Sequence, residues 1–351
     1  MQKIWWEQVP KALLFCSDIV NSLLDEKSIL LHHSEALPWE SYFKSFVKDS
    51  VAQKSATKTF HTLSDTDSPG SALLQEFCAQ TKRAQYRPSK GYAAFLAQSD
   101  DIVLHNQYLW INISSIEQLD VWTSFVADYL KERGHGKDRA VFILDWRSED
   151  PPSRRKGITL FSFDAYISEY DRIVFSTLAS SSISERTEIK NYLAELTANV
   201  LGNDIELNAE CISRHKDFMR NPFMVITNIV ESSERSDGST FQFDKSAPEV
   251  DRLIWLAQIR SIYPLIEEYR EIFIQSHKTA IRAQLPISSS YEEVYTDPND
   301  VELGTLYYMA SSGALPLISD EYVRLKAFRD ARNTLSHLGL LTFEDILNLL
   351  E

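Results

Sequence analysis

Apolar residues in the first part of the chain follow two different spacings. Short continuous apolar runs predict buried strands, at residues 28–31, 108–113, 140–145 and 158–163. Apolar positions three or four residues apart predict helices, at residues 5–24, after Pro38, around 72–81 and at 116–132. Strands that alternate with helices are typical of a mostly parallel sheet covered on both faces. The pattern therefore predicts an α/β domain over residues 1–163.

After residue 163 the spacing becomes helical for the rest of the chain. Residues 164–235 predict a helical subdomain, with helices at 166–178, behind the capping pattern Ser182-x-x-Glu185, and at 204–218. The polar segment 232–239 is typical of a linker. Residues 236–351 predict an all-α four-helix bundle, with helices at 249–277, from Asp297-Pro298, from Ser319 and from Thr342-x-x-Asp345.

Charge and composition narrow the class of protein. The 351 residues include 36 Lys and Arg against 50 Asp and Glu, a formal net charge of −14. Such a charge disfavours general binding to nucleic-acid phosphates, so any RNA contact must be local. We expect a cytoplasmic protein without a membrane contact, because the sequence shows no secretory signal and no apolar stretch of about 18 residues. The three cysteines are too scattered for a disulfide framework or a metal pair.

Neighbouring histidines in a predicted strand give a second test for a metal site. His32 and His33 are adjacent, and adjacent strand residues face opposite sides of a sheet, so one ion cannot easily bind both. We expect both to be structural, and we expect neither a metal nor a cofactor.

A polar group near the C-terminus carries the strongest candidate chemistry. In the helix expected from Ser319, the residues Asn333, Ser336 and His337 share one face. A separate apolar stripe is formed by Leu325, Phe328, Ala331, Leu335 and Leu338. Histidine titrates in the range useful for acid/base work, and the guanidinium of Arg332 suits phosphoryl oxygens. These residue types fit RNA cleavage without a metal.

The segment Arg332-Asn333-x-x-x-His337, the four predicted helices and the preceding residues 301–306 resemble the HEPN superfamily over roughly residues 245–351. The resemblance implies a helical bundle, often a metal-independent ribonuclease whose site forms between two protomers. It assigns acid/base work to His337, phosphate contact to Arg332 and an orienting role to Asn333. Substrate-binding residues would be Arg324, Lys326, Arg329 and Ser336.

The function expected from this resemblance is a HEPN-type ribonuclease effector of a prokaryotic defence or toxin system. The N-terminal region would sense a trigger or bind a protein partner, and the chain would form a homodimer that acts on RNA. The alternative is a catalytically inactive adaptor or interaction protein in a defence or regulatory assembly.

A weaker resemblance links the N-terminal region to a degenerate P-loop NTPase-like fold. The apolar strand at 141–144 ends in Asp145, as do strands that hold Mg²⁺ in that fold. A phosphate-binding loop would need glycines and a Lys after the strand that ends at His33, but residues 34–40 contain neither. The other interpretation of Asp145 is a strand-end residue that caps a turn.

Overall fold

The computed structural model describes residues 1–55, 57–135, 137–153, 155–202, 204–288 and 294–350. The chain forms two compact units, each treated by itself below. The first comprises Met1–Asp171 with Ser236–Gly238, and the second comprises Arg172–Arg235 with Ser239–Glu351. Within the described ranges, no helix combines the length and the apolar character needed to cross a membrane.

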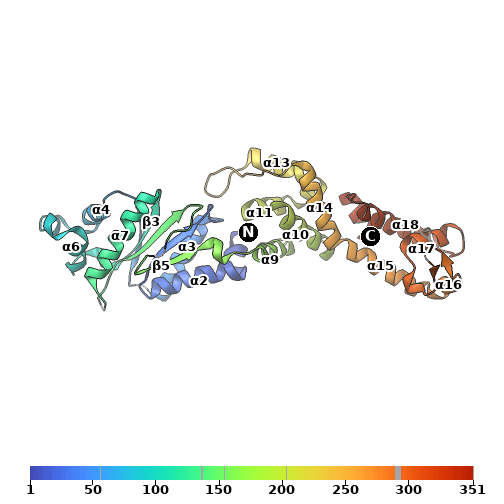
Figure 1. Cartoon of the computed structure of the whole chain (residues 1–351), viewed down its shortest axis with the longest axis horizontal. Coiled ribbons are helices and arrows are strands. Elements are labelled where there is room, and N and C mark those ends of the chain that lie inside the picture. The colour runs from blue at the N-terminus through green and yellow to red at the C-terminus, as the bar shows by residue number, and fades with distance from the viewer. Residues whose placement is uncertain (56, 136, 154, 203, 289–293, 351) are drawn as a thin grey trace. The chain divides into compact units, whose positions relative to one another are not determined.

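The first unit is built on a five-stranded sheet in the order β2-β3-β4-β1-β5, with every neighbouring pair parallel (Figure 1). The strands are β1 (Ser28–His33), β2 (Thr59–Ser64), β3 (Gln107–Ile113), β4 (Val141–Arg147) and β5 (Ile158–Ser162). The predicted α/β class of the N-terminal region is confirmed. The sequence pattern missed β2, because this edge strand is mostly exposed or half-buried and lacks an apolar run.

Helices cover both faces of this sheet (Figure 1). They are α1 (Gln2–Gln8), α2 (Pro10–Leu24), α3 (Glu40–Lys54), α4 (Pro69–Phe77), α5 (Gln80–Arg83), α6 (Tyr92–Gln98), α7 (Ile116–Arg133) and α8 (Phe163–Tyr166), with the short 3₁₀ turns η1 (Pro88–Lys90) and η2 (Val103–Asn106). The helix expected over residues 5–24 is two helices. Its break lies at Val9, which is extended and precedes Pro10, as the steric demands of proline favour.

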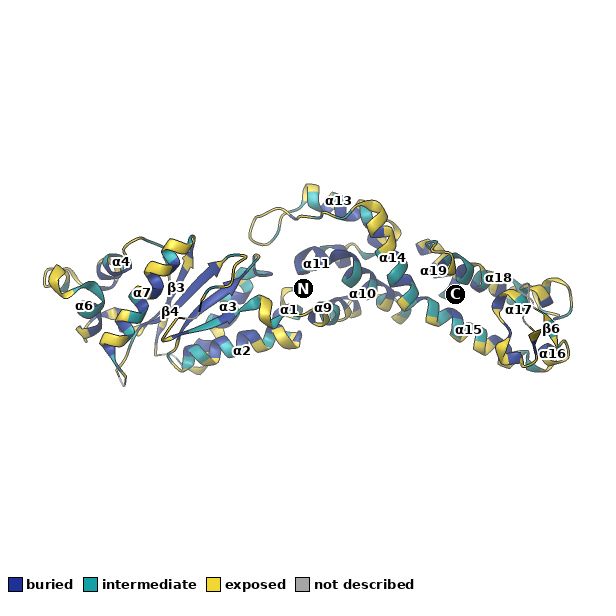
Figure 2. Ribbon diagram, viewed as in Figure 1, coloured by how far each residue is buried: buried dark blue, intermediate teal, exposed yellow. Residues whose placement is uncertain are grey.

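Alternate residues of the central strands pack into two hydrophobic cores, one on each face of the sheet. Leu109 and Phe142 point towards α7, where they join a cluster with Trp122 and Tyr129. Trp110 of β3 has the opposite parity and contacts Phe43 of α3, which packs with Trp6 of α1 and Phe15 of α2. Burial on both faces explains why β1, β3 and β4 read as continuous apolar runs (Figure 2).

The second unit is largely helical. Its elements are the greater part of α9 (Glu169–Ser181), α10 (Thr187–Leu201), α11 (Ile205–Ser213), α12 (His215–Arg220), α13 (Pro222–Ser232), α14 (Ala247–Ser261), α15 (Tyr263–Ser276), α16 (Lys278–Arg282), β6 (Ile287–Ser288), β7 (Val294–Tyr295), η3 (Pro298–Asp300), α17 (Leu303–Ser311), α18 (Ser319–Ser336) and α19 (Phe343–Leu350). The strands β6 and β7 form a small antiparallel pair. The C-terminal region is therefore helical with one short hairpin, and its likeness to a four-helix HEPN bundle stays a prediction.

The buried Gln258 on α14 ties several helices of this unit together. Its amide nitrogen donates to the Leu341 carbonyl at 2.8 Å and to the Tyr192 hydroxyl of α10 at 3.4 Å. Its amide oxygen accepts from the Leu341 N–H at 2.9 Å. Helix α10 precedes the predicted linker at 232–239 and α14 follows it, yet both belong to one compact unit. The finer three-part division stays a prediction.

Helix boundaries in this unit differ from the pattern at several places, and the helix expected over 204–218 is two helices, α11 and α12. The helix expected over 249–277 is split at Ile262, just before Pro264. Asp297 does cap a turn with Pro298 at its first position, but that turn is 3₁₀ and α17 begins at Leu303. Helix α10 begins at Thr187 and not behind Ser182. By contrast, Thr342 and Asp345 cap α19 as predicted.

Candidate functional site

Polar side chains gather at the carboxyl ends of β1, β3 and β4 in the first unit. Ligands of open parallel sheets bind outside this edge, so the side chains here decide what the unit can hold. The sheet register pairs Asn112 of β3 with Asp145 of β4, while β1 ends beside β4 at His33. Helix α3 packs over the same face and contributes Lys44.

The Asp145 carboxylate is the centre of this cluster, and its side chain is only 5% exposed. His33 Nε2 lies 3.0 Å from Oδ1. The Trp110 indole N–H donates to Oδ2 at 2.8 Å, and Lys44 Nζ lies 3.0 Å from the same oxygen. A buried charge is tolerated when it is paired and hydrogen-bonded, and Asp145 meets both conditions.

Lys44 is shared among three oxygen acceptors. Besides Asp145 it contacts Glu40 Oε1, one helical turn earlier on α3, at 2.5 Å, and it donates to Asn112 Oδ1 at 3.0 Å. Its ammonium also lies 5.2 Å from the centroid of the Trp110 ring. Every donor of this ammonium therefore has a partner inside the protein.

The charges of this cluster shift one another's pKa values. Burial alone would raise the pKa of Asp145, but the hydrogen bond from His33 and the charge of Lys44 outweigh it and hold the pKa below its ordinary value. Burial likewise opposes the charged form of His33, yet the hydrogen bond and charge of Asp145 raise its pKa. The pKa of Lys44 is raised as well, because the Asp145 and Glu40 carboxylates overcome its burial. The cluster favours its fully charged form.

The segment after β1 is also occupied by internal hydrogen bonds. The N–H of Ser34 donates to Asp164 Oδ2 at 2.9 Å, and the Ser34 hydroxyl donates to Oδ1 at 3.0 Å. His33 Nδ1 donates to the Glu35 carbonyl at 2.6 Å, and the Trp6 indole donates to the Pro38 carbonyl at 2.7 Å. A phosphate-binding loop would aim free N–H groups at its ligand. Here a carboxylate of the protein accepts the N–H of Ser34.

The sequence had pointed to Asp145 but not to its partners. Two interpretations were open, an Mg²⁺-holding residue or a cap of a turn, and the structure gives Asp145 a third role as the acceptor of a buried network. Lys44 and Trp110 went unnoticed, although the Glu40-x-x-x-Lys44 spacing marks an ion pair along a helix. His32 faces away from this network, between Ser162 Oγ at 3.1 Å and the Ser148 carbonyl at 2.9 Å.

The predicted catalytic segment lies at the end of α18 in the second unit. Arg332 forms an ion pair with Glu302 at 2.8 Å, and Asn333 is half-buried beside it in the helix. Ser336 is the last helical residue, and both it and His337 are exposed. His337 is the C-cap residue of α18, and its N–H donates to the Asn333 carbonyl at 3.1 Å. That its side chain shares a face with Asn333 stays a prediction.

The apolar stripe of α18 is nearly as the spacing predicted. Leu325, Phe328, Ala331 and Leu335 are buried, but Leu338 is 73% exposed. Leu338 departs from the stripe because the helix has ended and its backbone is left-handed, with φ of 60°.

The predicted substrate-binding cations are held largely by aromatic rings. The Arg324 guanidinium lies 5.7 Å from the centroid of Phe328 and 5.9 Å from that of Tyr269. The Arg329 guanidinium lies 4.0 Å from the centroid of Tyr307 and contacts Asp330 at 2.6 Å. Lys326 is exposed. Their role in binding a substrate stays a prediction.

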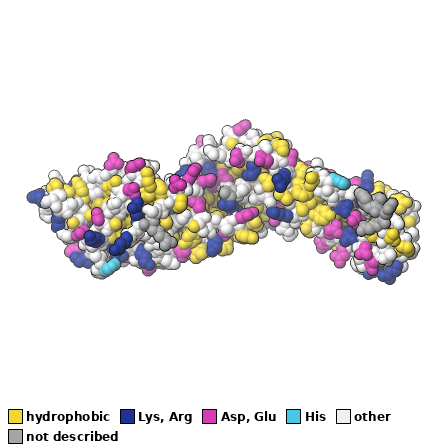
Figure 3. All heavy atoms as spheres, in the orientation of Figure 1, with side chains coloured by type: hydrophobic (Ala, Val, Ile, Leu, Met, Phe, Trp, Pro, Cys, Tyr) yellow, Lys and Arg dark blue, Asp and Glu magenta, His cyan; other side chains and the backbone are white. Residues whose placement is uncertain are grey.

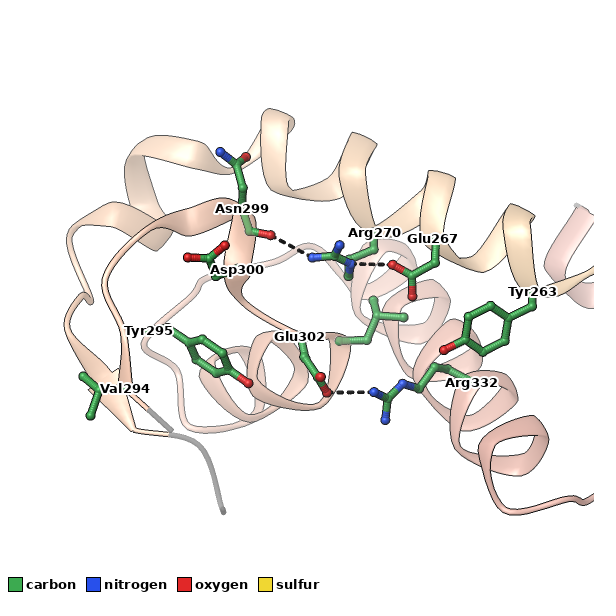
Figure 4. Close-up of a pocket in the computed structure, with 10 residues that line it drawn as sticks. Tyr263, Glu267, Arg270, Val294, Tyr295, Asn299, Asp300, Glu302 and Arg332 are labelled. Atoms are coloured by element: carbon green, nitrogen blue, oxygen red, sulfur yellow. Dashed lines mark hydrogen bonds and ion pairs between the residues drawn. The ribbon is translucent and has the colours of Figure 1, made fainter. Parts of the chain in front are cut away.

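Arg332 borders a cavity of about 650 Å³ in the second unit (Figure 4). Its wall is formed by side chains from α15, β7, η3, α17 and α18, namely Tyr263, Glu267, Arg270, Val294, Tyr295, Asn299, Asp300, Glu302, Leu303 and Arg332. Acidic groups outnumber basic ones in this wall. In the ranges that the structure describes, no three His, Cys, Asp or Glu residues are grouped to hold a metal ion.

Comparison with known proteins gives solved structures of low similarity, and two of them are described here. C. elegans PCH-2 shares 11% identity at a TM-score of 0.31, over 70% of this chain and 67% of that one. Rhizobiales Trip13 shares 12% identity at a TM-score of 0.32, over 72% of this chain and 88% of that one. No family model and no curated protein matches the sequence. Likeness at this level assigns neither a family nor a role to this chain.

The expected HEPN-type ribonuclease function is wrong. Neither of the two solved structures named above is a HEPN ribonuclease, and no family model, HEPN or other, matches the sequence. In the structure Arg332 is paired with Glu302, and His337 is the C-cap residue of α18. The acid/base, phosphate-contacting and orienting roles of Arg332, Asn333 and His337 were implied only by that function.

Proposed function

We propose that the chain is a nucleotide-independent protein-binding protein, in which the α/β unit is a rigid scaffold and the helical unit offers the binding surface. The observation that carries this proposal is the Asp145 network at the carboxyl edge of the sheet. That edge is where a parallel α/β sheet normally takes its ligand. In this chain it is filled by the protein's own charged groups.

A nucleotide at this edge would meet carboxylates instead of free donors. Its phosphates would approach Asp145 and Asp164, and like charges at close range repel. Lys44 and the N–H of Ser34 would have to leave their present acceptors first. Removing Lys44 would leave Asp145 buried with less compensation, which costs several kcal/mol in typical proteins.

The surface of the helical unit supports a protein ligand. Seven large apolar side chains in the described part of this unit are at least half exposed, at Met224, Ile272, Val294, Tyr308, Ile318, Val323 and Leu338. On the face shown in Figure 3, Lys and Arg side chains are scattered among Asp and Glu side chains. The whole chain has a net charge of −14, which suits a protein partner better than a polyphosphate backbone. The homodimer expected from the sequence stays a prediction.

Nucleotide binding is the first test. Calorimetric titration of the full chain with ATP and Mg²⁺ should show no saturable heat at ligand concentrations up to about 1 mM. A Kd of about 1 mM corresponds to a binding free energy of roughly −4 kcal/mol. A Kd below about 10 μM would mean specific contacts and would overturn the proposal. ADP is titrated in parallel, so that product-specific binding is also seen.

Site-specific photocrosslinking tests the second part of the proposal, that the helical unit binds another protein. A photoreactive phenylalanine analogue is placed at Val323 in the helical unit or at Val103 in the α/β unit, which are 62% and 58% exposed. A discrete adduct with another protein is expected from position 323 and not from position 103, with or without ATP depletion. Adducts from position 103 alone, or adducts lost on ATP depletion, would contradict the proposal.

A further inference from the structure

The cavity beside Arg332 has a neighbouring cavity along α15. The second has a volume of about 580 Å³ and shares Glu267, Arg270 and Asn299 with the first. It adds Glu268 and Glu271 to the wall. Together the two cavities contain two guanidinium groups and five carboxylates, so carboxylates are in excess by three.

Both guanidinium groups in this wall are already neutralised by the protein. Arg270 Nε donates to Glu267 Oε2 at 2.8 Å, and its Nη1 donates to the Asn299 carbonyl at 2.9 Å. Arg332 Nη2 donates to Glu302 Oε2 at 2.8 Å. Figure 4 shows the two ion pairs on neighbouring sides of the cavity. An incoming anion would meet a carboxylate beside each of the two cations.

Several carboxylate oxygens in the wall remain available as acceptors. Each of the two ion pairs uses Oε2, and no protein donor reaches Oε1 of Glu267 or Glu302 from the residues that the structure places. Asp300 has no ion pair or side-chain hydrogen bond to any residue of the described ranges. A guanidinium or ammonium group can bind such oxygens with charge-assisted hydrogen bonds.

Aromatic and apolar groups complete the wall around these acceptors. Tyr263 comes from α15 and Tyr295 from β7, where the ring is 7% exposed, and Leu303 begins α17. Tyrosine rings attract cations, and apolar side chains cover the methylene stem of a long basic residue. The wall thus has parts suited to both the charged tip and the stem of such a side chain.

We propose that this cavity binds an arginine side chain of a protein partner, with Asp300, Glu302 and Glu267 as its acceptors. The proposal rests on the protein-binding function and names the chemistry of the partner. Arginine fits better than lysine because its planar fork can reach two carboxylates at once. The excess of carboxylates along α15 would attract a segment with further basic residues.

A tripeptide pair isolates the charge of the ligand. Acetyl-Gly-Arg-Gly-amide is titrated against the full-length protein by ligand-observed NMR, beside the same peptide with citrulline in place of arginine. Citrulline has nearly the same shape but no charge. The arginine peptide should bind at least about tenfold more tightly, since a charge-assisted hydrogen bond contributes about 1.5–3 kcal/mol. Equal binding of the two peptides, or no binding of either, would overturn the proposal.

Two substitutions in the cavity should act in opposite directions. Asp300→Asn removes an acceptor and should weaken binding of the arginine peptide about tenfold. Arg332→Gln frees Glu302 and should tighten binding of the same peptide. Asp251→Asn is the matched control, because Asp251 is exposed, is outside both cavities and has no ion pair within the described ranges. It should leave affinity unchanged.

The same variants also show whether the cavity is an anion site instead. If inorganic phosphate binds more tightly than the arginine peptide and Arg332→Gln abolishes that binding, the cation assignment is wrong. These results are independent of the ATP titration, which tests the α/β unit. A failed peptide titration with no ATP binding would therefore remove the arginine proposal and leave the nucleotide-independent scaffold standing.

Discussion

His33 Nε2 lies 3.0 Å from Asp145 Oδ1, and both side chains are only 5% exposed. The contact joins the last residue of β1 to the carboxyl end of β4. The charged form of each residue stabilises that of the other, as the raised pKa of His33 and the lowered pKa of Asp145 show. This pair closes the edge of the sheet at which a nucleotide would bind.

Loss of the Asp145 charge should destabilise the α/β unit. Asp145→Asn leaves His33 and Lys44 without their shared anion in a buried place, and such a change typically costs about 3–5 kcal/mol. Asp150→Asn is the control, because Asp150 is exposed and should change stability by no more than about 0.5 kcal/mol. Hydrogen exchange of peptides from β1 and β4 measures the local stability of both variants. Equal protection in the two variants would contradict the role given to Asp145.

Stability of the α/β unit should depend on pH through the same pair. Because the pKa of His33 is raised in the folded state, the stability that His33 contributes is complete below the ordinary pKa of 6.5. This stability is lost as pH rises through the folded-state pKa. The lowered pKa of Asp145 means that its contribution is complete above 3.8 and is lost as pH falls through its folded-state pKa. The pair therefore stabilises the fold most between these two ordinary values.

Thermal melting between pH 4 and pH 9 checks this pH dependence, with His33→Gln as the comparison. The difference in Tm between wild type and His33→Gln should be largest near pH 5 and shrink as pH rises past the titration of His33. A difference that grows above pH 7 would show that neutral histidine is the stabilising form. Glu40 and Lys44 face the same pair and are unchanged in the variant.

Two glycine substitutions should change stability with opposite signs. A Cβ at Gly70 in α4 would lie 2.2 Å from Tyr92 Cβ, so Gly70→Ala forces a backbone shift that costs about 1–3 kcal/mol. A Cβ at Gly304 in α17 would meet no atom within 4 Å, so Gly304→Ala should gain roughly 0.5–1 kcal/mol from helix propensity. Denaturant unfolding monitored by circular dichroism compares them. If both substitutions changed the stability in the same direction, the close packing described at Gly70 would be contradicted.

Leu335 and His337 should respond differently to alanine, although they are two residues apart. Leu335 is fully buried in the stripe of α18, and Leu335→Ala should cost about 2–5 kcal/mol. His337 is exposed beyond the helix end, and His337→Ala should change stability by no more than about 0.5 kcal/mol. Hydrogen exchange of α18 peptides distinguishes them. Strong deprotection in His337→Ala would mean that the histidine has a structural role.

The sequence by itself determined most of the elements and the class of the first unit. Continuous apolar runs at β1, β3 and β4 predict strands buried on both faces, and the helical spacing between them predicts the helices that cover the sheet. The stripe of α18 and the cap at Thr342 follow from the same local rules. These features depend on neighbours within about a turn or a strand, so one sequence contains enough information to predict them.

Only the tertiary structure decided what the polar residues do. Asp145 meets His33 across 112 positions of sequence and Trp110 across 35, and no local pattern encodes those distances. Arg332 meets Glu302, 30 positions away, and this turned a predicted phosphate contact into one wall of an acidic cavity. A charged side chain acts through whichever group the fold places within a few ångströms. Local periodicity fixes the face of a helix or strand, but long-range packing selects the partner and with it the chemistry.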